Sequence, residues 1–306
     1  MRFAIIGRTK MLLETAHLAV KLGHELVCVI TSKEAPEYNA TTNDFQDLAH
    51  QLNAPFAKGS NILEFYEVLK SSKADIALSI NYTGVIPSAI IDLFQHGILN
   101  AHGGDLPRYR GNACQAWAII NGEDKIGLCI HKMIGGELDS GDIFEKKLYP
   151  IDINTKIGDV YEWFEKDIPE LMIKALNNIA SSETFQPIIQ SNNSQDVLRC
   201  YPRRPEDGLI DWGNSAIDIL RLINASNKPY AGAFCNFEGE KLIVWNAELV
   251  IDEEIFCAIP GQVTKIGKGF VEVACLKSKI RLLSIEYRGM ETSPDIVFKS
   301  IRMRLL

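Results

Sequence analysis

Two polar side chains with catalytic potential, Asn100 and His102, stand two positions apart at the start of an unusually polar stretch that runs to Gly111. If they end a strand, this spacing places both side chains on the same face of the sheet. Histidine can act as a general base because its pKa lies near neutrality, and the amide N–H of asparagine can stabilise a developing oxyanion. The pair therefore predicts a catalytic site centred on His102.

A third group is needed to orient the imidazole of His102 or to balance its charge. Asp139 is the candidate, because it stands in a loop expected between two strands. Two structural interpretations stay open at this point: a histidine at a strand end is often purely structural, and Asp-x-Gly, as in Asp139 to Gly141, is a common turn. The remaining histidines lack such polar neighbours and are expected to be structural or exposed: His17, His24, His50, His96 and His131.

Short apolar runs alternate with amphipathic segments in the first third of the chain. This alternation is typical of a parallel sheet covered by helices on both faces, and such sheets bind ligands at the carboxyl ends of their strands. Asn100 follows the fourth expected strand, whereas Gly7, after the first strand, begins neither a dinucleotide-binding nor a phosphate-binding glycine motif. Strands are expected at 3–6, 26–30, 76–80 and 97–99, and helices at 11–22, 43–52, 61–69 and 87–94.

The pattern changes after the first third. The segment 181–193 is rich in Ser, Asn and Gln and lacks periodicity, which indicates a linker. Beyond residue 201, short strand-like runs separated by Gly and Pro predict a smaller domain that resembles an open, OB-like barrel. The predicted fold class is therefore α/β, with a Rossmann-like parallel-sheet catalytic domain at 1–190 and a strand-rich C-terminal domain at 200–306. The later elements are expected as helices at 113–120, 155–179 and 215–225 and as strands at 127–130, 143–148, 233–236, 242–250, 261–266, 270–274 and 280–285.

The chain is acidic, because its 306 residues hold 32 Lys and Arg against 39 Asp and Glu, a net charge of −7. Binding the phosphate backbone of a nucleic acid requires a basic surface, so this excess of acidic residues disfavours nucleic-acid binding as the main function. We find neither a membrane-spanning apolar run nor a signal-peptide pattern at the N-terminus, and we expect a cytoplasmic protein that binds no membrane. The seven cysteines are scattered without a C-x-x-C pair, which argues against a metal site and favours free thiols in a reducing compartment.

Two sets of residues that follow one another in a fixed order are more specific than the spacing of Asn100 and His102 alone. The first comprises Asn100-x-His102, Leu106-Pro107-x-x-Arg110-Gly111, Trp117 to Gly122, Gly127, His131-x-Met133 and Asp139-x-Gly141-Asp142. The second comprises Pro202 to Trp212, Pro229 to Phe234, and Lys241 with Trp245. In this order the first set, within about Tyr82 to Ile143, resembles the folate-dependent formyltransferases, and the second resembles the C-terminal domain of that family. The family includes methionyl-tRNA formyltransferase and the nucleotide-sugar N-formyltransferases.

The resemblance implies an N-formyltransferase whose donor is 10-formyltetrahydrofolate and whose acceptor is a primary amine. Asn100, His102 and Asp139 match the catalytic Asn, His and Asp of the family, with Asp142 as the alternative to Asp139. The implied mechanism is attack of the amine on the formyl carbon to give a tetrahedral intermediate. His102 takes the amine proton, Asn100 stabilises the oxyanion, and Asp139 holds His102 and favours its charged form. The residues implied to bind the donor are Tyr82, Thr83, Gly84, Val85, Ile86 and Asp142.

The chain departs from the family pattern near the expected acceptor. Gly104-Asp105 stands where the family usually has Ser-Leu, and the usual proline is missing from Asn112 to Gln115. Arg8 and Lys10 follow the first strand, where two cations suit one diphosphate, although solvated charges at a helix start are an equal alternative. The residues expected to contact the acceptor are Arg8, Lys10, Gly104, Asp105, Arg110 and Arg204.

The negative net charge of the chain and the cations Arg8 and Lys10 together favour a nucleotide-linked amino sugar as the acceptor. The expected product is an N-formyl sugar for a surface polysaccharide. Methionyl-tRNA formyltransferase is the first alternative, although tRNA would need an extended basic surface. A non-catalytic folate-binding member is the second alternative. The sequence leaves open whether the chain forms a homodimer.

Overall fold

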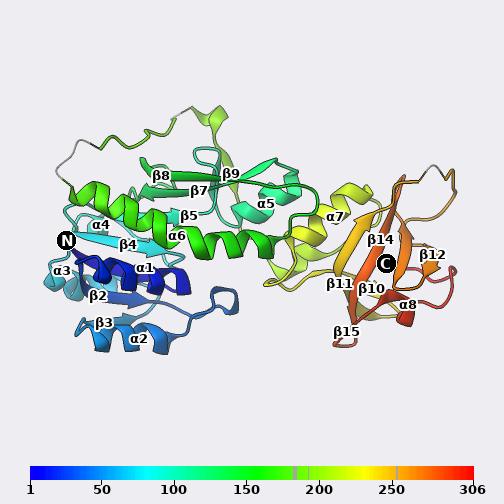
Figure 1. Ribbon diagram of the computed structural model, residues 1–306, viewed down its shortest axis with the longest axis horizontal. Coiled ribbons are helices and arrows are strands. Elements are labelled where there is room, and N and C mark those ends of the chain that lie inside the picture. Colours follow the sequence, from blue (N-terminus) through cyan, green and yellow to red (C-terminus); the bar gives the residue numbers. More distant parts are fainter. Residues whose placement is uncertain (182–184, 192, 253) are drawn as a thin grey trace. The chain divides into compact units, whose positions relative to one another are not determined.

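The computed structural model describes residues 1–181, 185–191, 193–252 and 254–306 (Figure 1). The chain divides into two compact units. Unit 1 holds residues 1–114, 126–149 and 161–201, and unit 2 holds residues 115–125, 150–160 and 202–306. Two segments of the expected first domain thus join unit 2, and the domain boundary expected between residues 190 and 200 stays a prediction.

Unit 1 is built on a seven-stranded sheet in the order β3-β2-β1-β4-β5-β7-β8. The pairings among β1 to β5 are all parallel, as expected for an α/β unit. One detail differs from the expected parallel sheet, because β7 runs antiparallel to β5. The chain reverses between these two strands, and mixed sheets of this kind are common. The strands are β1 (Arg2–Gly7), β2 (Glu25–Thr31), β3 (Phe56–Lys58), β4 (Ile76–Ile80), β5 (Ile98–His102), β7 (Lys125–Lys132) and β8 (Ile143–Pro150).

The first strand and the first helix meet at a close backbone contact. A Cβ on Gly7 would lie 2.2 Å from the carbonyl oxygen of Ile80, so only glycine fits at the end of β1. Thr9 then caps helix α1, because its Oγ1 accepts a hydrogen bond from Leu12 N at 3.2 Å. The helices with residues in this unit are α1 (Lys10–Lys21), α2 (Thr42–Gln51), α3 (Tyr66–Ser72), α4 (Ser88–Ile91) and α6 (Ile157–Ala180), with 3-10 turns at η1 (Pro36–Tyr38) and η2 (Ile62–Phe65).

The segment predicted to be a linker packs within unit 1, as far as the structure describes it. Ile188 exchanges backbone hydrogen bonds with Ile143 at 2.8 and 2.9 Å. Strand β9 (Leu198–Cys200), which the sequence did not predict, pairs in parallel with β6 (Tyr109–Gly111). These partners are distant in sequence, so no local periodicity marks them; residues 182–184 and 192 lie outside the described part.

Unit 2 contains a six-stranded antiparallel sheet in the order β10-β11-β14-β13-β12, with β15 paired to β14. Buried side chains from these strands and from α7 form its core. Trp212, which precedes α7, and Phe298, which follows α8, are among the largest core side chains. The expected strand-rich second fold is confirmed. Its strands are β10 (Ala233–Phe237), β11 (Glu240–Leu249), β12 (Val263–Gly267), β13 (Phe270–Ala274), β14 (Lys279–Tyr287) and β15 (Met290–Thr292). The remaining elements are α5 (Cys114–Asn121), which begins in unit 1, η3 (Ser194–Asp196) of unit 1, and η4 (Pro205–Gly208), α7 (Ala216–Ala225) and α8 (Pro294–Val297).

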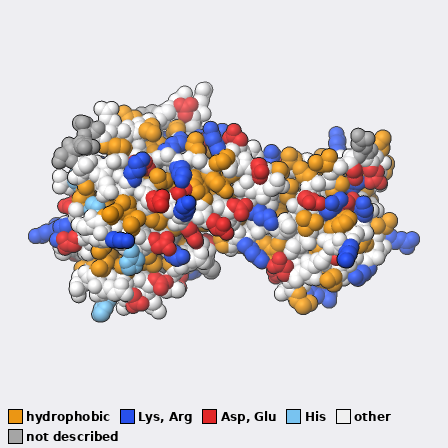
Figure 2. Space-filling view, in the orientation of Figure 1, with side chains coloured by type: hydrophobic (Ala, Val, Ile, Leu, Met, Phe, Trp, Pro, Cys, Tyr) orange, Lys and Arg blue, Asp and Glu red, His pale blue; other side chains and the backbone are white. Residues whose placement is uncertain are grey.

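The molecular surface carries charges of both signs. On the face that Figure 2 shows, Lys and Arg side chains are interspersed with Asp and Glu. Among the described helices, none combines the length and the apolar character needed to cross a membrane.

Candidate active site

Asn100 and His102 lie on β5, and the antiparallel strand β7 brings a second histidine beside them. The register pairs Asn100 with His131, and Asn100 Nδ2 lies 3.2 Å from His131 Nε2. His131 Nδ1 is 3.0 Å from the carbonyl oxygen of Lys132. A carbonyl can only accept, so Nδ1 carries a proton, and Nε2 accepts from the Asn100 amide when it holds no proton itself. His131 was expected to lack polar neighbours; this was wrong, because it holds the side chain of Asn100.

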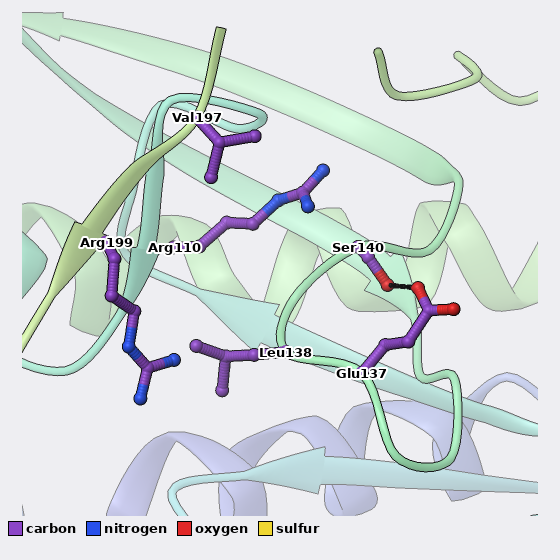
Figure 3. A pocket seen from close by; sticks show the side chains of 6 residues that line it. All are labelled: Arg110, Glu137, Leu138, Ser140, Val197 and Arg199. Carbon is purple, nitrogen blue, oxygen red and sulfur yellow. Dashed lines mark hydrogen bonds between the residues drawn. The ribbon is translucent and has the colours of Figure 1, made fainter. Parts of the chain in front are cut away.

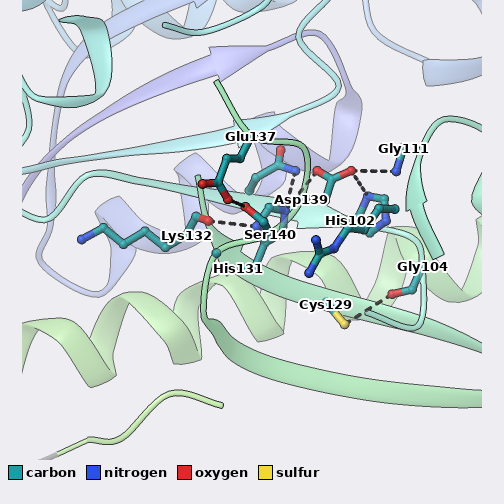
Figure 4. Close-up of polar contacts among 12 residues, drawn as sticks. His102, Gly104, Gly111, Cys129, His131, Lys132, Glu137, Asp139 and Ser140 are labelled. Atoms are coloured by element: carbon teal, nitrogen blue, oxygen red, sulfur yellow. Dashed lines mark hydrogen bonds and ion pairs between the residues drawn. The ribbon is translucent and has the colours of Figure 1, made fainter. Parts of the chain in front are cut away.

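The imidazole of His102 lies between the carbonyl of Tyr109 and the carboxylate of Asp139. Figure 4 shows its contact with Asp139. Its Nε2 is 2.6 Å from the carbonyl oxygen of Tyr109, so Nε2 carries a proton and donates it there. The lone pair of the neutral ring is then on Nδ1, which lies 3.6 Å from Asp139 Oδ2. Because this separation exceeds a hydrogen bond, Nδ1 can take a proton from a third group. The neighbouring carboxylate would then stabilise the cation.

The absence of a side chain at Gly104 makes this arrangement of His102 feasible. A Cβ there would lie 2.3 Å from the carbonyl oxygen of Tyr109 and 2.5 Å from His102 Nε2. Any larger residue would separate the two partners of the short hydrogen bond. The structure therefore gives Gly104 a clear task beside His102, while its expected contact with the acceptor stays a prediction.

Asp139 reaches both histidines from the loop between β7 and β8. Its Oδ1 lies 3.4 Å from His131 Nε2, and its Oδ2 accepts a hydrogen bond from the backbone N–H of Gly111 at 2.9 Å. The backbone of Asp139 has φ of +47°, in the left-handed region, which aspartate tolerates better than most residues. The loop thus turns sharply at the residue whose carboxylate joins the two imidazoles.

Burial and neighbouring charges shift the pKa values of Asp139 and His102 in opposite directions. Burial raises the pKa of Asp139, but His102, His131 and the Gly111 N–H outweigh it and hold that pKa well below its usual range. Burial is also the largest effect on His102, whose pKa it lowers, and Asp139 only partly opposes this. Asp139 favours the charged imidazole, as expected, but burial outweighs it, so the net direction for His102 is towards the neutral form. The site therefore combines an ionised carboxylate with a neutral base near pH 7.

These directions predict the titration of His102. We expect its imidazole to titrate below about 6.5, the ordinary value for histidine. In Asp139→Asn the midpoint should fall further, because the charge that raises the His102 pKa is removed. Nitrogen-15 NMR of the ring measures both midpoints, with the spectrum of His102→Gln assigning the signal. A midpoint above the ordinary value in the unaltered protein would contradict the dominance of burial.

The loop after β4, implied to bind the donor, leaves its backbone polar groups free. Among the described residues, no hydrogen bond involves a backbone N–H or C=O of residues 82–86. The loop is held by its side chains, because Tyr82 Oη donates to the Gly59 carbonyl at 2.7 Å and Ile86 is buried. Val85 is 85% exposed, and a Cβ on Gly84 would lie 2.0 Å from the carbonyl oxygen of Ser60. The backbone N–H and C=O groups of residues 82–86 are thus available to hydrogen-bond the edge of a flat heterocycle such as a pterin.

Thr83 is exposed in the same loop, whereas Asp142 lies outside this loop, directly before β8. The backbone carbonyl of Asp142 accepts from Lys132 N at 2.9 Å. It is the carboxylate of Asp139, not that of Asp142, that the structure places between the two imidazoles. The donor contacts expected of Thr83 and Asp142 stay predictions.

The cations expected to hold a diphosphate after the first strand already have partners. Arg8 donates to the carbonyl oxygens of Asn81 at 2.9 Å and Lys33 at 3.0 Å. Lys10 forms an exposed ion pair with Glu14 at 3.4 Å. These contacts favour a structural role for Arg8 over diphosphate binding.

Two further residues expected at the acceptor, Asp105 and Arg204, have polar partners within their own units. Asp105 forms an ion pair with Lys146 at 2.5 Å, which fixes the chain beside Gly104. Arg204 belongs to unit 2, where its backbone N–H donates to Asp207 at 2.6 Å. Contacts of Asp105 and Arg204 with the acceptor stay predictions.

Arg110 lies at the loop that carries Asp139, and Gln190 links the two. Gln190 Nε2 donates to the carbonyl oxygens of Asp139 at 2.8 Å and Gly141 at 2.6 Å. Its Oε1 accepts from Arg110 Nη2 at 2.8 Å. Gln190 is buried, although it stands in the segment predicted to be a linker. The structure thus adds Gln190 to the residues that position Asp139.

Replacing Gln190 by alanine should lower the free energy of unfolding by about 2–4 kcal/mol, because the buried Gly141 carbonyl, the half-buried Asp139 carbonyl and one guanidinium lose their partner. Urea denaturation followed by circular dichroism measures this change. Gln195→Ala is the matched control, since Gln195 is exposed in the same segment and should change stability by less than about 0.5 kcal/mol. Equal stability of the two variants would contradict the positioning role of Gln190.

Comparison with known proteins connects this geometry to a family. The family described as Formyl transferase matches residues 1–176, and the one described as Formyl transferase, C-terminal domain, matches residues 203–295. A methionyl-tRNA formyltransferase of Acetivibrio thermocellus is 27% identical over 292 residues, which cover 94% of this chain and 92% of that protein.

Two solved structures are similar in fold. The N-formyltransferase from Helicobacter canadensis, crystallised with folinic acid and dTDP-3-aminofucose, has a TM-score of 0.67 at 18% identity and covers 92% of this chain and 98% of its own. HypX from Aquifex aeolicus in complex with tetrahydrofolic acid has a TM-score of 0.62 at 19% identity, over 98% of this chain. The present chain spans only 47% of HypX. At 18–19% sequence identity these two structures show a similarity of fold alone. The two family matches, in contrast, cover most of the sequence. The chain therefore belongs to the formyl transferase family of enzymes.

Proposed function

We propose that this protein transfers a formyl group from 10-formyltetrahydrofolate to the primary amine of a nucleotide-linked amino sugar. The observation that carries the chemistry is the position of His102, between the Tyr109 carbonyl and the Asp139 carboxylate. The amide of Asn100, on the same strand face, completes the site. The free backbone of residues 82–86 supports a folate donor, which supplies the formyl group.

Each residue has a defined task in this proposal. His102 Nδ1 takes the proton that the attacking amine loses, and Asp139 stabilises the resulting imidazolium from 3.6 Å. When the bond between the formyl carbon and N10 of the donor breaks, the imidazolium can return this proton to N10, so that tetrahydrofolate leaves. The Tyr109 carbonyl holds Nε2–H, so the ring keeps its orientation. One amide N–H of Asn100 is used by His131, and the other can donate to the formyl oxygen as negative charge develops there.

Charge supports a small phosphorylated acceptor over tRNA. The chain carries −7, and residues 202–306 hold 14 Lys and Arg against 14 Asp and Glu. Such a balanced C-terminal segment provides no general attraction for a phosphate backbone. The relative from Helicobacter canadensis, crystallised with a dTDP-linked amino sugar, has a similar fold over 98% of its length. The product would be an N-formyl sugar suited to surface polysaccharide synthesis.

One observation favours a second candidate function, methionyl-tRNA formylation. The relative from Acetivibrio thermocellus, which matches 94% of this chain, is a methionyl-tRNA formyltransferase. Both candidates share the donor and the chemistry of His102, so they differ only in the acceptor. We place either reaction in the cytoplasm, because the seven cysteines are free thiols and suit a reducing compartment.

An acceptor panel tests the proposal. The protein is mixed with 10-formyltetrahydrofolate and, separately, with UDP-, dTDP-, GDP- and CMP-linked amino sugars or with charged initiator tRNA. We expect release of tetrahydrofolate and an N-formyl product with at least one amino sugar, and none with the matching hydroxyl sugar, which lacks the amine. Formylation of the tRNA alone would overturn the sugar acceptor. Folate binding without formylation of any acceptor would favour a non-catalytic member of the family.

A further inference from the structure

The turn between β5 and β6 supplies the carbonyl that holds His102 Nε2. Within this turn the carbonyl oxygen of Asp105 accepts hydrogen bonds from Arg108 N at 3.0 Å and from Tyr109 N at 3.3 Å. The carbonyl oxygen of Tyr109 in turn accepts from His102 Nε2 at 2.6 Å. The place of this carbonyl on the imidazole ring therefore depends on the position of Asp105.

One lysine side chain binds two successive residues of the turn. Lys146 on β8 forms an ion pair through Nζ with Asp105 Oδ1 at 2.5 Å, and the same Nζ donates to the carbonyl oxygen of Leu106 at 2.8 Å. Both charged side chains are only 26% exposed, so salt and water screen this pair less than an exposed one. Lys146 thus connects the turn to strand β8.

The turn also packs closely against β7. A Cβ on Gly127 would lie 2.4 Å from Asp105 Cα. Cys129 Sγ donates to the carbonyl oxygen of Gly104 at 3.3 Å (Figure 4). These contacts hold the backbone of Gly104 and Asp105 against the sheet, whereas Lys146 holds the side chain of Asp105.

The far end of the same segment is held by other residues. Strand β6 pairs with β9, and Arg110 Nη2 donates to Gln190 Oε1 at 2.8 Å. Figure 3 shows Arg110 lining a pocket together with Ser140, the residue after Asp139. Gln190 therefore fixes the end of the segment that meets the Asp139 loop, and Lys146 fixes the turn that leads to it.

We propose that Lys146 and Asp105 are positioning residues for His102. Their ion pair sets the place of the Tyr109 carbonyl, which keeps the ring proton on Nε2 and leaves the lone pair on Nδ1 for the attacking amine. The inference rests on the proposed role of His102 as the base. It gives Asp105, where the chain departs from the family pattern, a task other than contact with the acceptor.

Formyl transfer by Lys146→Met, with the acceptor that the panel identifies, tests this role. We expect kcat to fall about 10–100-fold with little change in KM, because small displacements of catalytic groups slow the reaction strongly. Lys146→Arg should recover most of the lost kcat, since a guanidinium can donate to both the carboxylate and the carbonyl.

Lys147→Met is the matched control, because it makes the same substitution at the next residue of β8. Lys147 forms an ion pair at 2.8 Å with Asp167 of helix α6, whose side chain is only 3% exposed. The control should lower thermal stability at least as much as Lys146→Met, since a buried carboxylate loses its partner. Its kcat should stay normal, because this ion pair lies with α6 and not with the turn.

Nitrogen-15 NMR of the His102 ring gives a readout that a general loss of stability does not move. Above its titration midpoint the ring of the unaltered protein should carry its proton on Nε2, as the contact with the Tyr109 carbonyl requires. In Lys146→Met the proton should be shared between the two nitrogens, whereas Lys147→Met should give the unaltered spectrum. Asp105→Asn keeps the shape of the side chain and should show a smaller change in the same direction, so it carries the test if Lys146→Met does not fold.

Three results would overturn the positioning role. The first is equal kcat in Lys146→Met and Lys147→Met, and the second is a His102 tautomer that does not change in Lys146→Met. The third is a higher acceptor KM in Asp105→Asn at unchanged kcat, which would return Asp105 to the acceptor. Normal kcat in His102→Gln would instead overturn the proposed function of His102 itself.

Discussion

Replacing His102 by glutamine should lower kcat for formyl transfer by about 10²–10⁴-fold, the usual contribution of a general base. Glutamine can still donate to the Tyr109 carbonyl, as Nε2 of His102 does at 2.6 Å, but it offers no basic nitrogen towards Asp139. The affinity for the acceptor should change little, because the imidazole acts on the proton that moves during the reaction. Initial rates of tetrahydrofolate release at saturating substrates measure the effect.

His17→Gln is the control for this experiment. His17 lies exposed on helix α1, so the same substitution should leave kcat unchanged. Circular dichroism of both variants verifies that the fold is retained. A His102→Gln enzyme with at least a tenth of the normal kcat would show that another group accepts the amine proton.

Replacing Asn100 by alanine should lower kcat by about 10²–10³-fold, as the loss of one oxyanion-stabilising donor commonly does. The amide nitrogen of Asn100 is held 3.2 Å from His131 Nε2, so one of its hydrogens has a fixed direction and the other is aligned in advance. The loss should appear in kcat more than in KM, because the formyl oxygen becomes strongly negative only during the reaction.

The matched control is Asn43→Ala, at an exposed position in helix α2, which should react normally. Equal kcat values for Asn100→Ala and Asn43→Ala would eliminate the amide as an oxyanion donor. A rise in KM alone would instead assign Asn100 to ground-state binding of a substrate.

The parts of the fold that depend on local pattern could be predicted from the sequence. Buried apolar runs marked β1, β2 and β4 within one or two residues, and the spacing of Asn100 and His102 placed both on one strand face. The loop expected between two strands led to Asp139, and the resemblance to the formyltransferases agreed with it. The family membership is confirmed by the comparison.

The features that depend on long-range pairing could not be predicted. His131 joins the site only because β7 runs antiparallel to β5 with a register that pairs it with Asn100. The local composition around His131 does not determine this register, because it depends on how two distant strands pair. Gln190 stands in a stretch without periodicity, yet it holds the Asp139 loop through two backbone carbonyls. The direction of the His102 pKa shift also depended on burial, which is a property of the folded chain.

The most direct test of the account is a crystal structure of the enzyme with an amino-sugar nucleotide that the panel identifies and with a non-reactive folate. The distance to measure joins the acceptor amine nitrogen to His102 Nδ1. We predict about 2.6–3.2 Å, the range in which a proton can be transferred, with the folate beside residues 82–86 and Asn100 Nδ2 facing the position of the formyl oxygen. An amine bound away from His102, or closer to another basic side chain, would contradict the assignment of His102 as the base.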